Sequence, residues 1–543
     1  MNSEIILCKN IKMDRDYNNV LNYTEANMLA LCRANAVASA SDYSFLRPTG
    51  NIFVGFTYDQ CLQANYIAFQ NKDYSNKWFF AWIDEVIWQG NKNCELRFTV
   101  DNFSTWFNKV TTQKCFITRQ HVNDDTIGAN IIEENLNIGE VVAETIEDYN
   151  KFSNFYIAVA STYEPSSSTY TINGNTYNGG SFSGVCLYNG QIFGQTIFLF
   201  DYEQLATIGV SMFIEQIIKE GHIEDIGALF IIPKNIFGEN DLITHNGYYG
   251  ETLPLVSYQY YVPVEKGTIV SDTKTINKTT SFSGVTVKNN KCYTYPYNYL
   301  YVTNNVGNDC IYRYEDFSTN DIKFDLEFAI SIGCSGRLIP KNYKGATTNY
   351  NESLPVAKFP TCSWSGDAFI NWLTQNGVNL ATQMVNIGIN SAVNTSNLVA
   401  GNLTGFTMGV LSISNNIANL IGQFYKASLL PSVVQGENNA DINYIVNKNK
   451  FIFYHMRVKT QYLKLIDDYF TRYGYAIKSL ETPNITGRTY WNFVEIGANE
   501  IIGYGEVPSK AMEDINNAFR KGVTIWHNHA NIGNFNLNNT IVT

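Results

Sequence analysis

Residues 78–100 read WFFAWIDEVIWQGNKNCELRFTV, and this stretch decides the fold class. Residues 78–88 are an aromatic-rich run of the kind found in strands, and Gly90-Asn91 offers a turn. From Cys94 to Val100, apolar and polar residues then alternate strictly. A period of two that follows a Gly-Asn break predicts a β-hairpin.

The composition extends this interpretation to the rest of the chain. The 543 residues are 45% hydrophobic and 14% aromatic, and 36 Tyr and 33 Phe favour strands over helices. Residues 150–365 consist of short apolar runs separated by clusters of Asn, Gly and Ser. A chain of this length is expected to hold roughly three or four domains with sizeable cores. We therefore expect a mainly β protein.

The net charge of −11 limits the function classes that fit. Proteins that wrap nucleic acid through the phosphate backbone need clustered Lys and Arg, and this chain has an excess of acids. An acidic surface remains compatible with DNA that slides past without binding. The net charge therefore argues against a protein that wraps nucleic acid through a basic surface.

The cysteines do not indicate a metal site. Each of the ten stands alone, without the Cys-x-x-Cys spacing of a zinc ligand pair. We interpret them as small buried hydrophobic residues from a reducing cytoplasm, with one structural disulfide as the alternative. The first ten residues lack a basic segment and a long apolar core, so no secretory signal is expected there.

Three further patterns predict local structure. The pentapeptide SFSGV occurs at 181–185 and again at 281–285, which hints at a repeated β domain. Residues 451–465 form a strand-like apolar run. A helix is expected to begin near Pro508 and to end at Gly522, with its apolar residues four positions apart.

Residues 368–425 contain no Asp, Glu, Lys, Arg or His. A transmembrane helix needs about 20 mostly apolar residues, but Thr, Gly, Ser and Asn interrupt this run throughout. Apolar residues at helical spacing recur within it, for example from Ile413 to Phe424, with Asn and Gln on another face. This pattern favours an amphiphilic segment that tolerates water and can enter lipid. The alternative is a buried helical hairpin in an ordinary core.

Common catalytic motifs are absent from the sequence. We find no phosphate-binding loop, no His-Glu-x-x-His and no Gly-x-Ser-x-Gly elbow. His527-Asn528-His529 invites comparison with HNH nucleases, but a contiguous tripeptide cannot reproduce that metal fold, and a terminal loop is the better interpretation. No cofactor is expected.

Carbohydrate chemistry has weak candidates. Glu133-Glu134 and Asp467-Asp468 are adjacent acids that point apart on a regular element, so we interpret them as solvated surface residues and not as a hydrolytic pair. Tryptophans 78, 82 and 88 could stack on sugars, but packing within a sheet is the better explanation.

Several blocks of sequence, in the same order, resemble one known family. In the N-terminal part they are ANYIAFQNKDYSNKWFF (64–80), TWF (105–107), FITRQHV (116–122) and NLNIG (135–139). In the C-terminal part they are YGY (473–475), NFV (492–494), GVTIWH (522–527) and NIGNF (531–535). These blocks resemble the tail knob, or distal tail tube, proteins of small short-tailed phages of Gram-positive bacteria. They cover about the first 140 and the last 90 residues.

The resemblance implies a hexameric tube of tail-tube-like β-barrel or sandwich domains. It implies a tube domain in residues 1–150 that residues 440–543 complete, middle β domains in 151–365, and an amphiphilic, partly helical loop in 366–435. The expected partners are five further copies of the chain, the proximal tail tube or collar, tip proteins, and genomic DNA in the lumen. The expected location is the distal end of the virion tail.

The same resemblance implies that the loop plugs the lumen before infection and then enters the host cytoplasmic membrane as part of a pore. Because the loop contains no His, a His-based pH switch within it is ruled out. The residues expected to plug the tube and insert into the membrane are Phe369, Trp372, Leu373, Leu380, Met384, Ile387, Leu403, Phe406, Met408, Leu411, Ile413, Ile417, Leu420, Ile421 and Phe424.

Two other functions stay open at this stage. One is a cell-wall-degrading enzyme at the tail tip with carboxylates that the sequence does not reveal. The other is a receptor-binding protein that uses the Tyr-rich middle domains on wall sugars.

Overall fold

The computed structural model describes residues 4–46, 50–72, 75–149, 155–172, 174–182, 186–188, 191–193, 196–201, 209–219, 226–234, 237–238, 240–249, 256–263, 271–303, 309–330, 334–344, 362–365, 451–497, 502–503 and 505–542. The chain divides into two compact units. Unit 1 comprises Met1–Val141, Ser281–Tyr297 and Val458–Thr543, and unit 2 comprises Val142–Thr280 and Asn298–Arg457. The main chain therefore passes between the units four times.

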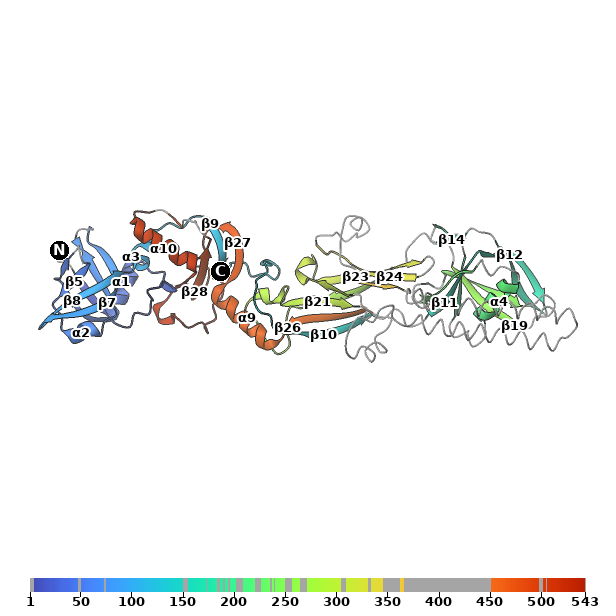
Figure 1. Cartoon of the computed structure of the whole chain (residues 1–543), viewed down its shortest axis with the longest axis horizontal. Helices are drawn as coiled ribbons and strands as arrows, with labels where there is room; N and C mark the ends of the chain where they lie inside the picture. The colour runs from blue at the N-terminus through green and yellow to red at the C-terminus, as the bar shows by residue number, and fades with distance from the viewer. Residues whose placement is uncertain are drawn as a thin grey trace, which may run out of the picture. The chain divides into compact units, whose positions relative to one another are not determined.

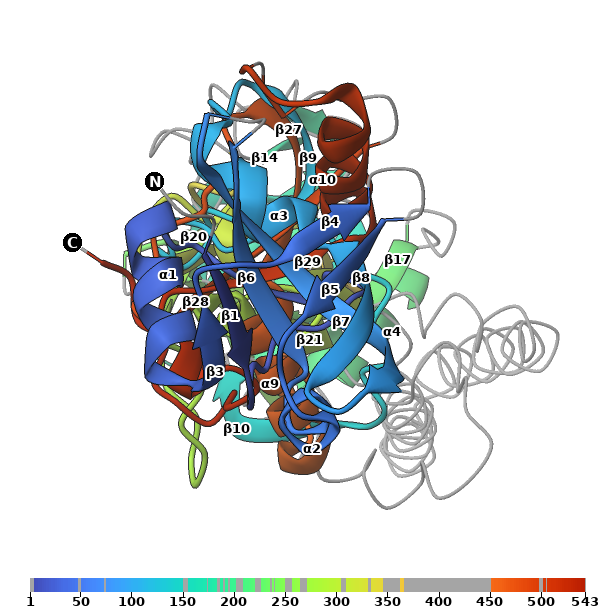
Figure 2. The same ribbon diagram turned by 90° about the vertical axis from the view of Figure 1, so that its left-hand side faces the viewer.

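A seven-stranded sheet forms the N-terminal part of unit 1 (Figure 1). Its strands, in sheet order, are β3 (Ala36–Ala40), β1 (Ile5–Cys8), β6 (Tyr66–Asn71), β7 (Lys77–Gly90), β8 (Asn93–Val100), β5 (Asn51–Val54) and β4 (Ser44–Leu46). Alternate residues of β1 enter two apolar clusters, Ile6 one and Ile5 the other, as the period of a strand requires. Helix α1 (Glu25–Ala34) contributes Cys32 to the first cluster, and α2 (Tyr58–Leu62) contributes Cys61 to the second. Figure 2 shows α1 beside β1 and β3.

The predicted hairpin is confirmed, with its turn one residue later than expected. Strand β7 pairs with β8 up to Gly90 and Asn93, so that Asn91 and Lys92 make the turn. Lys92 has a φ of 57°, which the left-handed region of a tight turn requires. Trp78 and Trp82 are buried in the sheet, whereas Trp88 near the turn is 64% exposed.

A five-stranded sheet forms the second part of unit 1. It consists of β2 (Asn19–Leu21), β29 (Val523–Trp526), β28 (Trp491–Ile496), β9 (Cys115–Gln120) and β27 (Tyr475–Glu481). Strands β2 and β29 are parallel, with Asn19 beside Thr524 and Leu21 beside Trp526. The helical elements of this part are α3 (Asn102–Trp106), η2 (Phe107–Lys109), η6 (Asn290–Tyr293), α9 (Thr460–Tyr473), α10 (Ser509–Lys521) and η8 (His529–Asn531).

Two predictions for the C-terminal region have different outcomes. The helix between Pro508 and Gly522 is confirmed as α10, and Gly522 ends it with a φ of 88°. The prediction of a strand over residues 451–465 is wrong in its second half, because β26 (Phe451–Val458) ends at Val458 and α9 begins at Thr460. The buried residues Leu463, Ile466 and Phe470 show why: their spacing is helical and the run of apolar residues concealed it.

Helix α9 ends at a position where glycine is required. Gly474 has a φ of 64° and lies against β9, so that a Cβ atom there would be 2.2 Å from the carbonyl oxygen of Gln120. The close approach lets the chain turn directly from α9 into β27. It also brings the end of the helix against β9 of the five-stranded sheet.

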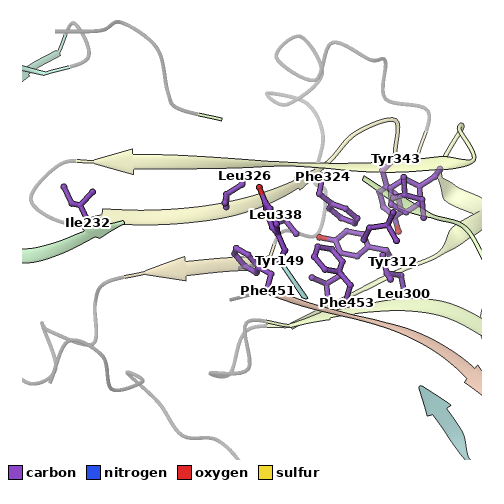
Figure 3. Close-up of a cluster of buried hydrophobic side chains, with 14 of the residues drawn as sticks. Tyr149, Ile232, Leu300, Tyr312, Phe324, Leu326, Leu338, Tyr343, Phe451 and Phe453 are labelled. Atoms are coloured by element: carbon purple, nitrogen blue, oxygen red, sulfur yellow. The ribbon is translucent and has the colours of Figure 1, made fainter. Parts of the chain in front are cut away.

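Unit 2 contains a two-sheet sandwich. One sheet consists of β10 (Val141–Tyr149), β26, β21 (Asn298–Thr303) and β22 (Asp309–Tyr312), with η7 (Tyr314–Asp316) after it. The other consists of β20 (Ser271–Asn277), β23 (Asp321–Ile330), β24 (Cys334–Pro340) and β25 (Cys362–Ser365). Figure 3 shows Phe324, Phe453 and Tyr312 gathered between the strands. The ring centroid of Phe324 lies 5.3 Å from that of Phe453 and 5.0 Å from that of Tyr312.

The rest of unit 2 is a five-stranded antiparallel sheet with smaller ribbons. The sheet has the order β17 (Ile226–Pro233), β11 (Phe155–Ser161), β16 (Thr196–Asp201), β19 (Val256–Pro263) and β18 (Leu242–Tyr249). The ribbons are β12 (Tyr163–Ile172) with β13 (Asn175–Phe182), and β14 (Cys186–Tyr188) with β15 (Gln191–Phe193). Helix α4 (Gly209–Lys219) packs near β19.

The mainly β fold class is confirmed.

The two copies of the repeated pentapeptide have different local structures in the described part of the chain. Ser181 and Phe182 end β13, whereas Phe282 and Val285 form an isolated bridge around Gly284. Of the helices that the structure describes, none combines the length and apolar character needed to span a bilayer.

Candidate functional site

The residues expected to plug the tube and enter the membrane lie outside the described residues. All fifteen fall between positions 366 and 450. The described residues that flank this region belong to the unit 2 sandwich, because β25 ends at Ser365 and β26 begins at Phe451. The long amphiphilic run is therefore an insertion between two strands of one folded unit.

The described residues contain no group of three or more His, Cys, Asp or Glu side chains that could hold a metal ion. The two histidines of the His527-Asn528-His529 tripeptide have separate structural partners. Nε2 of His527 lies 3.1 Å from Oδ1 of Asn492, and Nε2 of His529 accepts a hydrogen bond from the backbone of Lys12. Burial lowers the pKa of both imidazoles. They serve the fold of the C-terminal segment.

The two pairs of adjacent acids correct a sequence prediction. Both pairs were expected at the solvated surface, but Glu134 and Asp467 are buried while Glu133 and Asp468 are exposed. Adjacent residues do point apart, as expected, so that each pair has one member in the interior. A buried carboxylate needs partners, and the partners of both residues define a polar site in unit 1.

Glu134 is the centre of an ionic cluster, which we define as Arg119, Glu134 and Lys291. One carboxylate oxygen pairs with the guanidinium of Arg119, and the other lies 2.5 Å from Nζ of Lys291. The second oxygen also accepts a hydrogen bond of 3.1 Å from the backbone N–H of Ala476. A single carboxylate thus holds two cations that come from distant parts of the sequence.

The surroundings of Lys291 are unusual for a lysine. Its side chain is 1% exposed, and Nζ lies 5.5 Å from the ring centroid of Phe470 and 5.3 Å from that of Tyr475. Burial and the nearby Arg119 lower the pKa of Lys291 to about 7. Burial also lowers the pKa of Arg119.

Asp467 forms a second polar centre next to the cluster. Its carboxylate accepts hydrogen bonds of 3.0 Å from the backbone N–H groups of Lys288 and Asn289. It also accepts one of 2.8 Å from the side-chain amide of Asn289. That amide donates to Oγ1 of Thr471 as well. All the donors to this carboxylate come from Ser281–Tyr297, which we call the inserted segment.

His121 links α9 to the five-stranded sheet. Its Nδ1 accepts a hydrogen bond of 2.8 Å from the backbone N–H of Phe493, so Nε2 carries the proton and donates to the carbonyl of Thr471 at 3.0 Å. Burial and the nearby Arg488 lower the pKa of His121 to about 3. The imidazole is therefore neutral in the folded protein, and its two bonds determine the tautomer.

Unit 1 also carries exposed apolar side chains at the border of the five-stranded sheet. Leu480 on the outermost strand β27 is 69% exposed and pairs across the sheet with Phe116, which is 37% exposed. In the seven-stranded sheet, β3 and β4 are the outermost strands. Sheet borders and exposed apolar side chains are surfaces on which protein partners commonly add.

Sequence reasoning missed the ionic cluster and His121. The phase of α9 could have revealed Asp467, because it lies four residues after Leu463 and three before Phe470 on the buried face. No local signal marks Glu134, because its cationic partners are Arg119 and the distant Lys291.

Two family descriptions match this chain and together cover most of it. Residues 265–540 match the family described as the C-terminal domain of tail knob protein gp9 of Bacillus phage phi29. Residues 1–112 match the family described as the N-terminus of caudoviral major tail proteins. The first match alone spans more than half of the 543 residues.

Individual relatives match over nearly the full length. Tail knob protein gp9 of Bacillus phage B103 is 22% identical, over 99% of this chain and 98% of its own. Tail knob protein gp9 of Bacillus phage phi29 is 20% identical, over 90% of both chains. The solved structure of the tail knob protein gp12 of bacteriophage C1 has a similar fold, with a TM-score of 0.59 at 14% identity. That similarity covers 99% of this chain and 100% of the other.

Proposed function

Because this chain belongs to the phage tail knob protein family, we propose that six copies form the distal tube of a short tail and that DNA passes through it into the host. As a tail knob protein, the chain is a structural component of the virion tail. The observation that carries the proposal is the family match over residues 265–540, together with a tail-protein match at residues 1–112. In this proposal, 1–150 and 440–543 make the tube domain and 151–365 the middle β domains.

The sheets of unit 1 support assembly into a ring. The seven-stranded sheet ends in β3 and β4, each of which has one paired neighbour within the described chain. Ring closure removes such borders from solvent. The proximal tail tube or collar and the tip proteins would contact the two ends of the ring.

The charge of the chain supports DNA passage. A net charge of −11 repels phosphate, so an acidic lumen lets DNA move without binding.

The paired acids that sequence analysis considered for hydrolysis do not form a catalytic pair. Glu134 and Asp467 are engaged in structural contacts, and Glu133 and Asp468 are exposed.

We assign the uncharged run to the plug and to membrane entry. Residues 368–425 carry no ionisable Asp, Glu, Lys, Arg or His, and the insertion begins and ends at strands of the unit 2 sandwich. Two antiparallel arms of about 29 residues each would reach about 43 Å as helices. This length exceeds the roughly 30 Å of a hydrocarbon core. Six copies would turn their Asn and Gln side chains toward one another or toward a water-filled lumen.

Dye release from liposomes tests membrane entry. The full-length protein is compared with a variant in which a Gly-Ser linker replaces residues 368–425, across a range of pH. We expect release from the full-length protein and none from the deletion variant, while the thermal unfolding of the two remains the same. Two results together would disprove membrane entry: the full-length protein releases no dye at any pH, and a phage that carries the deletion infects normally.

The assembly state tests the tube separately. Native mass spectrometry of the purified protein should detect six copies of the 61.4 kDa chain. A chain that stays monomeric at high concentration, and that lacks a six-fold tube in virion tails, would contradict the hexamer without bearing on membrane entry.

A further inference from the structure

The inserted segment Ser281–Tyr297 is a short part of unit 1 between two long parts of unit 2. The residues before it, Val142–Thr280, and after it, Asn298–Arg457, both belong to unit 2. Its longest regular element is η6, which is four residues long. A segment with so little regular secondary structure depends for its conformation on the surface on which it docks.

Its docking contacts fall on α9 and on the segment around Asp125. The carboxylate of Asp467 accepts the backbone N–H groups of Lys288 and Asn289. The side-chain amide of Asn290 donates to the carbonyl of Asp125 at 2.7 Å. Apolar contacts complete the surface: five buried residues of the segment share an apolar cluster with α9, namely Phe282, Val285, Cys292, Tyr293 and Tyr297.

The ionic cluster makes departure of the segment less costly in charge than the removal of one partner from an ordinary buried ion pair. When the segment is docked, Glu134 faces both Arg119 and Lys291. When it leaves, Lys291 returns to water and Glu134 keeps Arg119 as a one-to-one pair. Breaking a buried ion pair is usually costly because one charge stays buried without a partner. Departure of the segment avoids this cost for Arg119, which stays paired with Glu134. Asp467 becomes open to solvent and is hydrated.

We propose that Ser281–Tyr297 is a detachable strap, which docks reversibly on α9 and the Glu134 carboxylate while the rest of unit 1 stays folded. With the strap docked, the main chain joins the units at four points. With the strap free, two direct connections remain, at 141–142 and 457–458. The 17 residues of the strap, roughly 55 to 60 Å when extended, then become a loop of unit 2. The strap is thus a device that changes the number of main-chain connections between the two units from four to two.

The chain contains its own reporter of strap release. Cys292 lies within the strap and is fully buried, and Cys115 and Cys8 are fully buried in the sheets of unit 1. A thiol that is buried in the folded state reacts with an alkylating reagent only when its surroundings open. Site-resolved mass spectrometry of the native full-length protein therefore compares opening of the strap with opening of the sheets.

We expect Cys292 to be alkylated at least about tenfold faster than Cys115 in the unmodified protein. Addition of low urea should raise the rate at Cys292 less steeply than the rate at Cys115, because opening of the strap exposes less surface than unfolding of the whole of unit 1. This comparison needs no substitution. If both cysteines react at the same rate with the same urea dependence, the segment opens only with the whole unit and is not a strap.

Substitutions identify the fastening. Asp467→Asn and Lys291→Met should each raise the rate at Cys292 by about tenfold or more, the effect expected for the loss of charged hydrogen bonds, with no change at Cys8. Asp468→Asn and Lys288→Met are matched controls, because these neighbouring side chains are exposed. An equal acceleration at Cys8 and Cys292 would show that the variants unfold unit 1 globally. An unchanged rate at Cys292 would show that the polar contacts do not fasten the strap.

Discussion

The core of the unit 2 sandwich and the docking site of the strap both join residues from distant parts of the chain, but by different physics. In the sandwich, Phe324 and Phe453 come together through apolar contact alone. At the strap, Lys291 and Arg119 come together around one carboxylate. Apolar contact is non-directional and adjusts to a change of shape, whereas a buried charge needs a partner of opposite sign. We therefore expect graded losses in the sandwich and abrupt losses at the ionic cluster.

The largest expected effect is in the sandwich. Phe324 is fully buried against Tyr312 and Phe453, so Phe324→Ala should lower the free energy of unfolding of unit 2 by about 4 kcal/mol. Phe324→Leu keeps most of the volume and should cost only about 1 kcal/mol. Urea unfolding followed by hydrogen exchange in β23 measures both. Equal losses for the two variants would show that the loss of stability in this core does not follow the side-chain volume removed.

The ionic cluster should respond with the second largest loss. Glu134→Ala leaves Arg119 buried without its carboxylate and should cost unit 1 about 3 kcal/mol. Glu134→Gln keeps the shape but removes the charge, and should cost nearly as much. Glu133→Ala, at the exposed neighbouring position, is the control and should change little. If Glu134→Gln leaves the free energy of unfolding of unit 1 nearly unchanged, the ionic cluster does not respond abruptly and does not differ from the sandwich in this respect.

A lower pH provides a further test of the comparison, because His121 is one of the buried groups in unit 1 that titrate under acidic conditions. In the folded state the pKa of this imidazole is about 3, and in the unfolded chain it returns to about 6.5. Between these values the unfolded chain binds the additional proton, so the stability is present above pH 6.5 and is lost as the pH falls toward 3. The loss attributable to His121 is at most about 1.4 kcal/mol per pH unit.

The measurement is the urea midpoint of unit 1 at several pH values. A His121→Asn variant should start less stable at neutral pH, because it loses the bonds to Phe493 and Thr471. Its stability should also fall less steeply between pH 6.5 and 4 than that of the unmodified protein. Parallel slopes for the two proteins would assign the acid sensitivity to other groups.

The smallest expected effect is at the surface. Leu480 on β27 is mostly exposed, so Leu480→Thr should change the stability of the isolated chain by less than about 0.5 kcal/mol. Thermal unfolding measures this change. A loss above about 1 kcal/mol would show that Leu480 packs against the fold more closely than its exposure implies.

The sequence predicted those parts of the fold in which pattern and structure are local. The alternation from Cys94 to Val100 and the spacing of apolar residues in α10 each lie within one element, and both predictions are confirmed. The prediction failed at α9, where an apolar run concealed a helical period. Glu134 was predicted to be a surface acid because its partners Arg119 and Lys291 lie 15 and 157 residues away, so no local pattern in the sequence indicates them. The fifteen plug residues stay a prediction, because they lie outside the described residues.

The pairing of β2 with β29 has a consequence for synthesis of the chain. Residues 19–21 can pair only after residues 524–526 have been synthesised, and Nε1 of Trp526 donates to the side chain of Asn19. A ribosome adds about 5 to 20 residues per second, so the first strand of this sheet is made well before its partner leaves the exit tunnel. Unit 2 lies wholly between these strands in the sequence and is free to fold first. A chain that terminates before residue 523 lacks β29 and leaves the five-stranded sheet of unit 1 incomplete.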